Sequence, residues 1–347
     1  MKKYVELYRK LKDEILSKKY SFGDKLESKR TMADKLGVSV ITVEKAYSML
    51  LDEGYIYARE RSGYYVSELN GLAPLPTIER VKPPLLEEES EYEGEDFEYS
   101  VYIKTLRRVV SEKRERIFIK TSGKGCAALR NAISEYLFRY RGMYAPPQRI
   151  VIGSGSEQLY ESIVKLLGRE KLIGIEDPSY SQIEAVYSGM GVRNRKLPMT
   201  SDGISSDALS DEIDVLHVTP FHSYPSGVTA SMGKRGEYLE WSKKNGGYII
   251  EDDFDSEFFL PGQPIETLYS MDKNDSVIYI NTFSKSLSPA MRIGYMILPE
   301  SLMEKYEATL GIYSCTVPAL DQYVLAEFIS SGSFERHLNR KRRGMRK

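Results

Sequence analysis

The stretch NTFSKSLSPAMRIGYM, residues 281–296, places a lysine and an arginine between two apolar segments. Lys285 follows a run that is typical of a buried strand, and Arg292 comes seven residues later. A lysine amine among apolar groups loses its proton more readily, and the neutral amine is the form that attacks a carbonyl carbon. Because a lone lysine is most often a surface residue, this interpretation depends on the groups that accompany Lys285.

Hydroxyl groups and a guanidinium accompany this lysine. Thr282, Ser284 and Ser286 carry hydroxyl donors, and Arg292 is close enough along the chain to return beside Lys285 after a tight loop. A guanidinium together with hydroxyl groups is suited to binding a phosphate.

A second segment offers backbone donors to the same anion. The sequence GSGSEQ, residues 153–158, puts a glycine turn between an expected strand and an expected helix. The free N–H groups of Ser156 and Glu157 would then lie at the positive end of that helix. Such turns also occur for reasons of packing, so this one supports a phosphate site only in combination with Lys285 and Arg292.

An amine that captures an aldehyde, next to a phosphate pocket, describes the cofactor pyridoxal 5'-phosphate (PLP). Its ring nitrogen needs a carboxylate partner, and Asp252 at the end of GYIIEDD is the first candidate, with Asp253 and Asp255 as rivals. Its flat ring needs a flat neighbour, and Tyr180 in EDPSY follows an expected strand. A single tyrosine is more commonly part of a core, so this interpretation of Tyr180 also depends on the presence of Lys285 and the phosphate-binding groups.

These residues lie where apolar runs alternate with helical stretches. The alternation predicts an α/β sheet covered by helices on both faces, an α/β/α arrangement with ligands at the carboxyl ends of the strands. Strands are expected in RIVIGSG, KLIGIED, DVLHVTP, GYIIEDD, SVIYINTFS and IGYMILP.

The first 67 residues have a different pattern. Apolar residues at helical spacing predict one helix from Tyr4 that SFGD at 21–24 interrupts, a second within 27–36, and a third that begins after Ser39 as its N-cap. The alternating stretch 55–66, with a turn at Ser62-Gly63, predicts a two-stranded wing. The order of these elements is that of a winged helix-turn-helix domain.

Charge separates this N-terminal head from the remainder of the chain. Residues 1–66 carry 14 Lys and Arg against 10 Asp and Glu, whereas residues 67–98 carry two against ten. A basic head suggests an anionic partner, although an ordinary solvated surface would give the same count. We expect a winged-helix domain at 1–67, an acidic proline-containing linker at 68–98 and a large domain at 99–347.

The head resembles the winged-helix domain of the GntR superfamily. The matching residues are Gly23-Asp24-Lys25-Leu26, Arg30, Gly37-Val38-Ser39, Thr42-Val43 and Gly63. The resemblance implies binding to double-stranded DNA, in which Arg30, Ser39 and Thr42 meet the backbone or base edges. Lys45 would reach a phosphate, and Gly63 belongs to the wing.

Two positions of the head depart from that pattern. Glu27 replaces a common proline, and Val40 replaces a common arginine. Arginine is the usual bidentate reader of guanine, so Val40 and Ile41 imply apolar contacts, with thymine methyl groups among the candidates, and the base preference stays open.

Residues 99–347 resemble the fold-type I aminotransferases, and with the head the chain resembles the MocR subfamily of GntR regulators. The motifs are GSGSEQ, EDPSY, YPSG, EDDFDSEF and TFSKSLSPAMRIGY. The resemblance implies that Lys285 forms the internal aldimine of PLP, Asp252 pairs the pyridinium and Tyr180 stacks. It also implies that the phosphate is bound by Ser156, Glu157, Thr282, Ser284 and Arg292.

Two features depart from a working aminotransferase. Phe254 stands where a tyrosine often contacts the phenolic oxygen of the cofactor, and Tyr224 stands where an asparagine precedes P-[ST]-G. Catalytic turnover is therefore less well supported, unless the Tyr224 hydroxyl substitutes. The chain also stops at FERHLNRKRRGMRK, where family members continue into a smaller domain, so we expect a shortened protein.

The sequence thus predicts a cytoplasmic, homodimeric transcriptional regulator that senses PLP or an amino compound through Lys285. An aminotransferase with an accessory N-terminal module is the alternative, and a cofactor-free dimerisation scaffold is a third hypothesis. No run approaches the roughly 20 apolar residues of a membrane span. Cys126, Cys315 and the three histidines show no metal-ligand spacing, so no metal site is expected.

Overall fold

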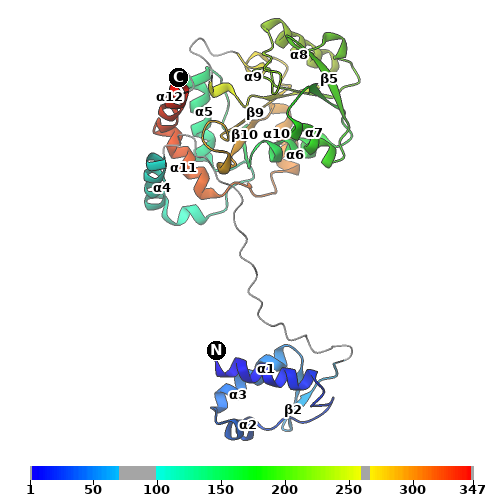
Figure 1. The fold of residues 1–347 in the computed structure, drawn as a ribbon, viewed down its shortest axis with the longest axis vertical. Helices are drawn as coiled ribbons and strands as arrows, with labels where there is room; N and C mark the ends of the chain where they lie inside the picture. The colour runs from blue at the N-terminus through cyan, green and yellow to red at the C-terminus, as the bar shows by residue number, and fades with distance from the viewer. Residues whose placement is uncertain (1, 70–98, 259–265, 345–347) are drawn as a thin grey trace. The chain divides into compact units, whose positions relative to one another are not determined.

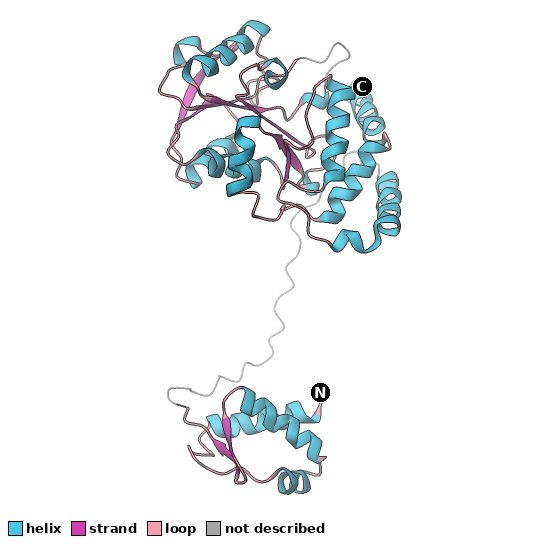
Figure 2. Ribbon diagram, turned by 180° about the vertical axis from the view of Figure 1, so that it is seen from behind, coloured by secondary structure: helices cyan, strands magenta, loops and turns pink. Residues whose placement is uncertain are grey.

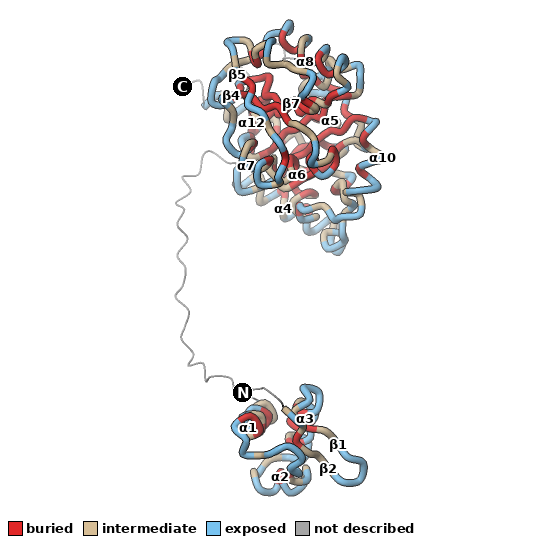
Figure 3. Tube along the Cα trace, turned by 90° about the vertical axis from the view of Figure 1, so that its right-hand side faces the viewer, coloured by how far each residue is buried: buried red, intermediate tan, exposed pale blue. Residues whose placement is uncertain are grey.

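The computed structural model describes residues 2–69, 99–258 and 266–344. The chain divides into two compact units, Met1–Glu91 and Tyr92–Lys347. Nearly all of the predicted linker, 68–98, lies outside the described residues. Each unit has its own buried core, which Figure 3 shows as red segments inside the exposed surface.

The head consists of three helices and a hairpin, so the predicted winged helix-turn-helix is confirmed. The elements are α1 Lys3–Leu16, α2 Lys29–Leu36, α3 Val40–Asp52, β1 Ile56–Arg59 and β2 Gly63–Val66. The first helix ends at Leu16, earlier than the SFGD segment predicted. The hairpin pairs Ile56 with Val66 and Arg59 with Gly63.

Caps determine where the helices of the head begin and end. The Ser39 hydroxyl accepts a hydrogen bond from the backbone N–H of Thr42 at 3.2 Å, as predicted for the N-cap of α3. Ser28 caps α2 in the same way. Gly37 ends α2 in the left-handed region at φ 62°, which a glycine adopts without strain.

The inner face of α3 forms the centre of the head. Val43, Ala46, Tyr47 and Leu50 are fully buried, because their helical spacing places them on one face. The Tyr47 hydroxyl donates a hydrogen bond to the backbone carbonyl of Glu27 at 2.9 Å. With this face buried, the opposite face of α3 is left to solvent or a partner.

The large unit is built on a twisted sheet with the strand order β3-β10-β9-β8-β7-β4-β5-β6. Strands β9, β8, β7, β4 and β5 are parallel, whereas β10 is antiparallel to both β9 and β3. The strands are β3 Ile150–Gly153, β4 Ile173–Asp177, β5 Asn194–Thr200, β6 Gly203–Ile204, β7 Val215–Val218, β8 Tyr248–Asp252, β9 Val277–Thr282 and β10 Gly294–Ile297.

Helices cover both faces of this sheet, so the predicted α/β/α fold is confirmed (Figures 1 and 2). Along β9, Tyr279 packs into one core and Ile278 and Ile280 into another, because successive side chains point to opposite faces. The helices are α4 Tyr99–Lys113, α5 Ala127–Arg141, α6 Ser156–Leu167, α7 Ser181–Gly189, α8 Met232–Asn245, α9 Leu268–Met271, α10 Glu300–Thr309, α11 Ala319–Ser330 and α12 Ser333–Gly344. The 3-10 segments are Arg114–Phe118, Ser206–Ala208, Ser256–Phe258 and Pro289–Met291.

The cores show which helix covers which face. Helices α5, α11 and α12 share one core with β3, β9 and β10, and α8 adds a second core on β7 and β8. Helices α6, α7 and α10 pack on the opposite face. No helix of the described residues is long and apolar enough to cross a membrane.

Candidate cofactor pocket

A pocket of about 330 Å³ opens at the edge of the sheet where the parallel strands end. Every residue that the sequence assigned to the cofactor lines it, so five strands and their following loops converge there. These residues are Ser156, Glu157, Tyr180, Tyr224, Asp252, Thr282, Ser284, Lys285 and Arg292. Ser286, another hydroxyl candidate of the lysine motif, is buried outside this lining.

The antiparallel direction of β10 brings Arg292 back to this edge. Gly294, the first residue of β10, pairs with Thr282 at the end of β9 and with Gly153 at the end of β3. The residues just before β10 therefore lie beside the residues just after β3. This register explains why an arginine seven positions after Lys285 belongs to the same pocket.

A close approach of backbone and side chain joins Arg292 to the turn before α6. A Cβ atom at Gly155 would lie 2.9 Å from Arg292 Nη2, and Gly155 has a φ of 96°. The Nη2 atom of Arg292 donates to Glu157 Oε2 at 2.8 Å. With the free N–H groups at the start of α6, the guanidinium forms a positively charged cradle for an anion.

The Lys285 amine lies at the mouth of the pocket with its side chain 43% exposed. It forms an ion pair with Asp255 Oδ1 at 2.5 Å, and the other oxygen of Asp255 lies 3.0 Å from His222 Nδ1. The rings of Phe254 and Phe258 flank the amine, with centroids 5.2 and 5.5 Å away. One rival of Asp252 thus contacts the lysine.

The second rival is engaged behind the pocket. Asp253 forms a buried ion pair with Arg141 at 3.1 Å and accepts a hydrogen bond from the Tyr279 hydroxyl at 2.6 Å. Burial raises the pKa of Asp253, and the guanidinium of Arg141 opposes that shift. Of the three aspartates, Asp252 is the one that lines the pocket.

Asp252 has one oxygen engaged and one available. Its Oδ2 accepts a hydrogen bond from the Tyr160 hydroxyl and lies 3.7 Å from His217 Nε2. Burial and the neighbouring carboxylate raise the pKa of Tyr160, so the hydroxyl keeps its proton. Asp252 Oδ1 is buried and has no hydrogen-bond partner among the described residues.

Behind Asp252 a second tyrosine orients the histidine. The Tyr187 hydroxyl and His217 Nδ1 are 2.7 Å apart, and both side chains are buried. The ring of His217 also packs edge-on against Tyr160, with centroids 5.0 Å apart. Asp252 is thus held by a polar network that extends along one face of the sheet to α7.

Two aromatic side chains stand at the outer wall of the pocket. Tyr180, at the start of α7, and Tyr224 have ring centroids 6.2 Å apart and are 43% and 60% exposed. Tyr180 is therefore no part of a core, and its face is accessible to a ring. Beneath the loop of Tyr224, Glu176 accepts hydrogen bonds from Thr219 N and the Ser223 hydroxyl.

Sequence reasoning missed several lining residues, namely Tyr160, Ile183 and Thr219. Tyr160 lies one helical turn after Ser156, and that spacing from the phosphate turn was a signal that could have identified it. No pattern in the sequence placed His217 beside this pocket. No cluster of three or more metal-ligating side chains exists among the described residues. The position of His217 beside Asp252 follows from the pairing of β7 with β8.

In the head, the residues assigned to DNA lie on the surface around the start of α3 and on the wing. Arg30, Ser39 and Lys45 are exposed, and Thr42 is half-buried. The Lys45 amine lies 5.6 Å from the ring centroid of Tyr4. Gly63 opens the second wing strand at a φ of 120°.

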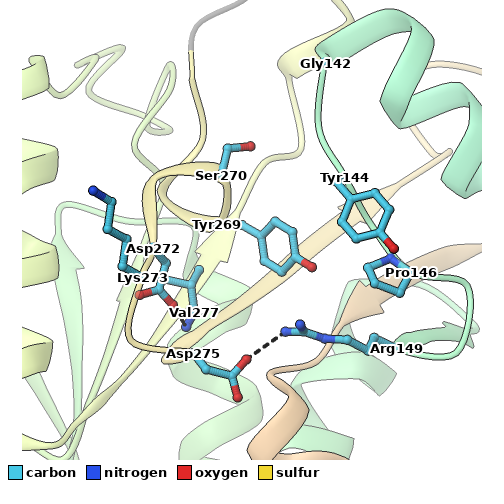
Figure 4. A pocket seen from close by; sticks show the side chains of 10 residues that line it. All are labelled: Gly142, Tyr144, Pro146, Arg149, Tyr269, Ser270, Asp272, Lys273, Asp275 and Val277. Atoms are coloured by element: carbon cyan, nitrogen blue, oxygen red, sulfur yellow. Dashed lines mark hydrogen bonds and ion pairs between the residues drawn. The ribbon is translucent and has the colours of Figure 1, made fainter.

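A larger cavity of about 440 Å³ lies at the opposite end of β9, where Val277 begins the strand (Figure 4). Arg149 points at Asp275 there, 2.9 Å away, and Tyr269 and Tyr144 stand above it. None of the predicted cofactor residues lines this cavity, and its arginine is already paired. Size alone therefore does not mark the cofactor pocket.

Comparison with known families gives a separate match for the head and for the large unit. Residues 3–66 match the family described as bacterial regulatory proteins, gntR family. Residues 89–347 match aminotransferase class I and II.

Curated relatives combine the same two parts. The uncharacterized HTH-type transcriptional regulator YdeL of Bacillus subtilis is 32% identical, over 99% of this chain and 77% of the relative. The probable rhizopine catabolism regulatory protein MocR of Rhizobium meliloti is 30% identical, over 97% and 74%. The pyridoxine biosynthesis transcriptional regulator PdxR of Corynebacterium glutamicum is 29% identical, over 92% and 71%.

Solved structures resemble the large unit. An archaeal alanine:glyoxylate aminotransferase is 25% identical with a TM-score of 0.63, over 70% of this chain and 62% of the enzyme. The α-aminoadipate aminotransferase LysN of Thermus thermophilus, complexed with N-(5'-phosphopyridoxyl)-L-leucine, is 26% identical with a TM-score of 0.61. The match covers 71% of this chain, which spans 64% of the length of LysN.

The fold and the pocket define a class of protein in which a winged helix-turn-helix head accompanies a fold-type I, aminotransferase-like domain. The chain belongs to the MocR subfamily of GntR-type transcriptional regulators. PLP is thereby confirmed as the cofactor of this class of domain. The residues present fit it, because the unpartnered Asp252 Oδ1 suits a protonated ring nitrogen and the Gly155 turn lets the Arg292 guanidinium approach the start of α6, where an anion would bind.

Proposed function

We propose that this protein regulates transcription by binding DNA through its head and by sensing PLP or an amino compound through Lys285. The observation that carries the proposal is the convergence of all nine assigned residues on one pocket, from segments between 156 and 292. A surface lysine would not meet a buried carboxylate, an anion cradle and two exposed aromatic rings in one place.

When bound, PLP supplies an aldehyde that condenses with amines, and a ring that withdraws electrons. The chain's own residues then have separate tasks. Lys285 offers the amine, and Asp252 holds a proton at the ring nitrogen, kept in place by Tyr160 and His217. Tyr180 would stack on the ring, and the Tyr224 ring lies 6.2 Å from that of Tyr180.

The phosphate would be held by donors from two directions. Thr282 and Ser284 offer hydroxyl groups at the end of β9, and Ser156 and Glu157 offer backbone N–H groups at the start of α6. Arg292 adds its charge from the start of β10, although it shares that charge with Glu157.

An amino compound that competes with Lys285 for the aldehyde would release the amine, and we propose this exchange as the sensing event. The amine then returns to Asp255, which already binds it at 2.5 Å. We further propose a homodimer, because two heads would bind paired half-sites on DNA through Arg30, Ser39, Thr42, Lys45 and the wing at Gly63.

The experiment measures cofactor binding by absorbance of the purified full chain. Wild-type protein with added PLP should show the visible band of a lysine adduct, and Lys285→Ala should lose it. Lys305→Ala, which removes an exposed lysine on α10, is the matched control and should keep the band. A colourless wild-type protein that takes up no PLP would support the scaffold hypothesis instead.

The same preparation tests the enzymatic alternative. Incubation with a panel of amino acids should produce the band changes of amine exchange without sustained formation of oxo acids. Phe254 supports this expectation, because it places no hydroxyl beside the lysine where an aminotransferase commonly has one. Steady turnover at rates typical of enzymes would show that the large unit is an aminotransferase.

A further inference from the structure

The first turn of α3 exposes two apolar side chains. Val40 is 41% exposed and Ile41 is 63% exposed, directly after the N-cap Ser39. Apolar surface exposed to water is energetically unfavourable, and an exposed isoleucine at this position contributes nothing to the core of the head. A binding partner that offers apolar groups to Val40 and Ile41 would explain why both are exposed.

The outward face of α3 identifies the side of the helix that meets this partner. Ile41, Lys45 and Ser48 follow one another at helical spacing, and all three are exposed. Glu44 lies on the same side, but its carboxylate is bound to the Lys29 amine at 2.6 Å. The face therefore presents an apolar end, a cation and a hydroxyl, with its acid already paired.

Exposed cations accompany the apolar end on the surface of the head. Arg30 on α2 and Lys45 on α3 are exposed, and neither has an ion pair among the described residues. On the wing, the Arg59 guanidinium lies over the ring of Tyr65, 4.7 Å from its centroid. A head that exposes both apolar side chains and cations suits an anionic surface that carries small apolar groups, and this charge complementarity favours DNA over an apolar protein surface.

The DNA major groove carries one apolar group, the C5-methyl of thymine. Recognition of guanine would need a donor such as arginine or lysine on the first turn of the helix. Residues 39–42 are Ser, Val, Ile and Thr, so that turn holds neither. The hydroxyl of Ser39 accepts from Thr42 N and also lies 2.8 Å from the Thr42 hydroxyl, so these two hydroxyl groups hydrogen-bond to each other at the N-cap.

We propose that Val40 and Ile41 read thymine methyl groups, so that each half-site bound by this protein has A·T pairs where the first turn of α3 enters the major groove. The inference rests on the proposed DNA-binding function and adds its base preference. Affinity for those pairs comes from methyl contacts, whereas the flanking cations fix the register on the phosphates.

The test uses DNA selected by the full-length protein from a random pool, followed by replacement of single thymines with uracil. This replacement deletes one methyl group and leaves hydrogen bonding unchanged. At the thymines that face α3, we expect a loss of about fourfold in affinity per methyl group. Thymines elsewhere in the site should tolerate the replacement.

A double-mutant cycle assigns the effect to the side chain. Ile41→Ala should weaken binding to the thymine site. In this variant the uracil replacement should leave the affinity for DNA almost unchanged. Leu51→Ala is the matched control, because Leu51 is an exposed apolar residue at the other end of α3. It should leave the thymine effect intact. Val40→Arg should shift the selected base toward guanine.

Two results would overturn the inference, and they are distinguishable. Binding to a selected site that is unaffected by every uracil replacement, or equally affected in Ile41→Ala, would reject methyl reading while leaving DNA binding in place. Failure to retain any DNA, even at low salt, would reject the proposed DNA-binding function and the inference with it.

Discussion

Glu176 is a buried carboxyl group that supports the pocket from below. It lies near the end of β4, where it accepts a hydrogen bond from Thr219 N at 3.0 Å and another from the Ser223 hydroxyl at 2.6 Å. Burial raises its pKa to about 7, and the two hydrogen bonds limit that rise. It therefore fastens the end of β7 and the loop before Tyr224 to the neighbouring strand.

The raised pKa of Glu176 makes stability depend on pH. Below pH 4.5, its ordinary pKa, the group is protonated in both the folded and unfolded states. Between there and about 7 the folded state alone keeps the proton, so this contribution falls as pH rises, and it is constant above that range. We predict that Glu176→Gln lowers the pH dependence of the free energy of unfolding by on the order of 3 kcal/mol across this window.

Denaturant titrations of both proteins at several pH values would measure this difference. Glutamine keeps an acceptor for Thr219 N, and the Ser223 hydroxyl can turn to accept from its amide. The raised pKa values of Glu251 and Glu257 are common to both proteins and cancel in the comparison. Glu240→Gln, at an exposed position of α8, should follow the wild type. Identical profiles for Glu176→Gln and wild type would contradict the prediction.

Residues with a distinctive chemistry could be assigned from the sequence, whereas their supports could not. Lys285 and Arg292 stand in a short motif, and the pocket contains both. His217 and Tyr187 are neighbours only because β4 and β7 are adjacent and α7 packs over them. The local sequence around His217 and Tyr187 does not reveal this contact. A histidine inside a buried strand has the same local sequence pattern when it is an ordinary core residue.

At the scale of elements, the turn between β3 and α6 depends on a glycine. Gly155 combines a φ of 96° with the close approach of Arg292 Nη2, so two independent constraints act on one position. Here the backbone must adopt a conformation that side chains disfavour, and the guanidinium occupies the space of a Cβ. The register of β10 leaves Arg292 no alternative position along this edge.

We predict that Gly155→Ala weakens PLP binding by at least tenfold, or about 1.4 kcal/mol, because Arg292 must move away from the anion cradle. The positive φ should also destabilise the fold by about 1 kcal/mol or more. Equilibrium titration of the absorbance band and thermal unfolding measure the two effects.

Gly236→Ala is the control for this substitution. Gly236 lies within α8, where an added Cβ atom would meet nothing within 4 Å, and it does not line the pocket. Alanine there should stabilise the helix by about 0.5–1 kcal/mol without changing PLP affinity. Unchanged affinity in Gly155→Ala would show that Arg292 has no part in binding the phosphate.

Elements with strong apolar periodicity could be predicted, and those formed by tertiary context could not. All six expected strands exist, because each is a buried apolar run. β5 was missed because NRKLPMT is largely polar, and it becomes a strand by pairing with β4 near the sheet edge. The short β6 follows it after a turn at Ser201-Asp202 and has only two residues to display a pattern.

At the scale of the molecule, the chain has separate hydrophobic cores in its two units. The core around Tyr47 and Leu50 contains residues of the head alone, and the cores of the sheet contain residues of the large unit alone. The single tryptophan, Trp241, belongs to the large unit, where its indole N–H donates to Ser210 O at 3.0 Å. Tryptophan fluorescence therefore reports on the large unit only.

We predict that the full chain unfolds in two steps that respond to different changes. PLP at 100 times its dissociation constant should stabilise the step seen by Trp241 fluorescence by about 2.7 kcal/mol, because it binds only the folded large unit. Lys285→Ala should reduce that gain. Leu50→Ala should instead lower the free energy of unfolding of the head by about 2–5 kcal/mol, because it opens a cavity there. This step is the one that circular dichroism detects and Trp241 fluorescence does not.

The two substitutions control for each other, since Lys285→Ala changes only the pocket of the large unit and Leu50→Ala changes only the core of the head. If PLP moved both steps equally, or if Leu50→Ala shifted the fluorescence transition, the two cores would unfold as one cooperative unit. Separate steps would mean that cofactor occupancy does not act on DNA binding by stabilising the head. In the proposed homodimer, regulation would then have to act through the placement of two intact heads on paired half-sites.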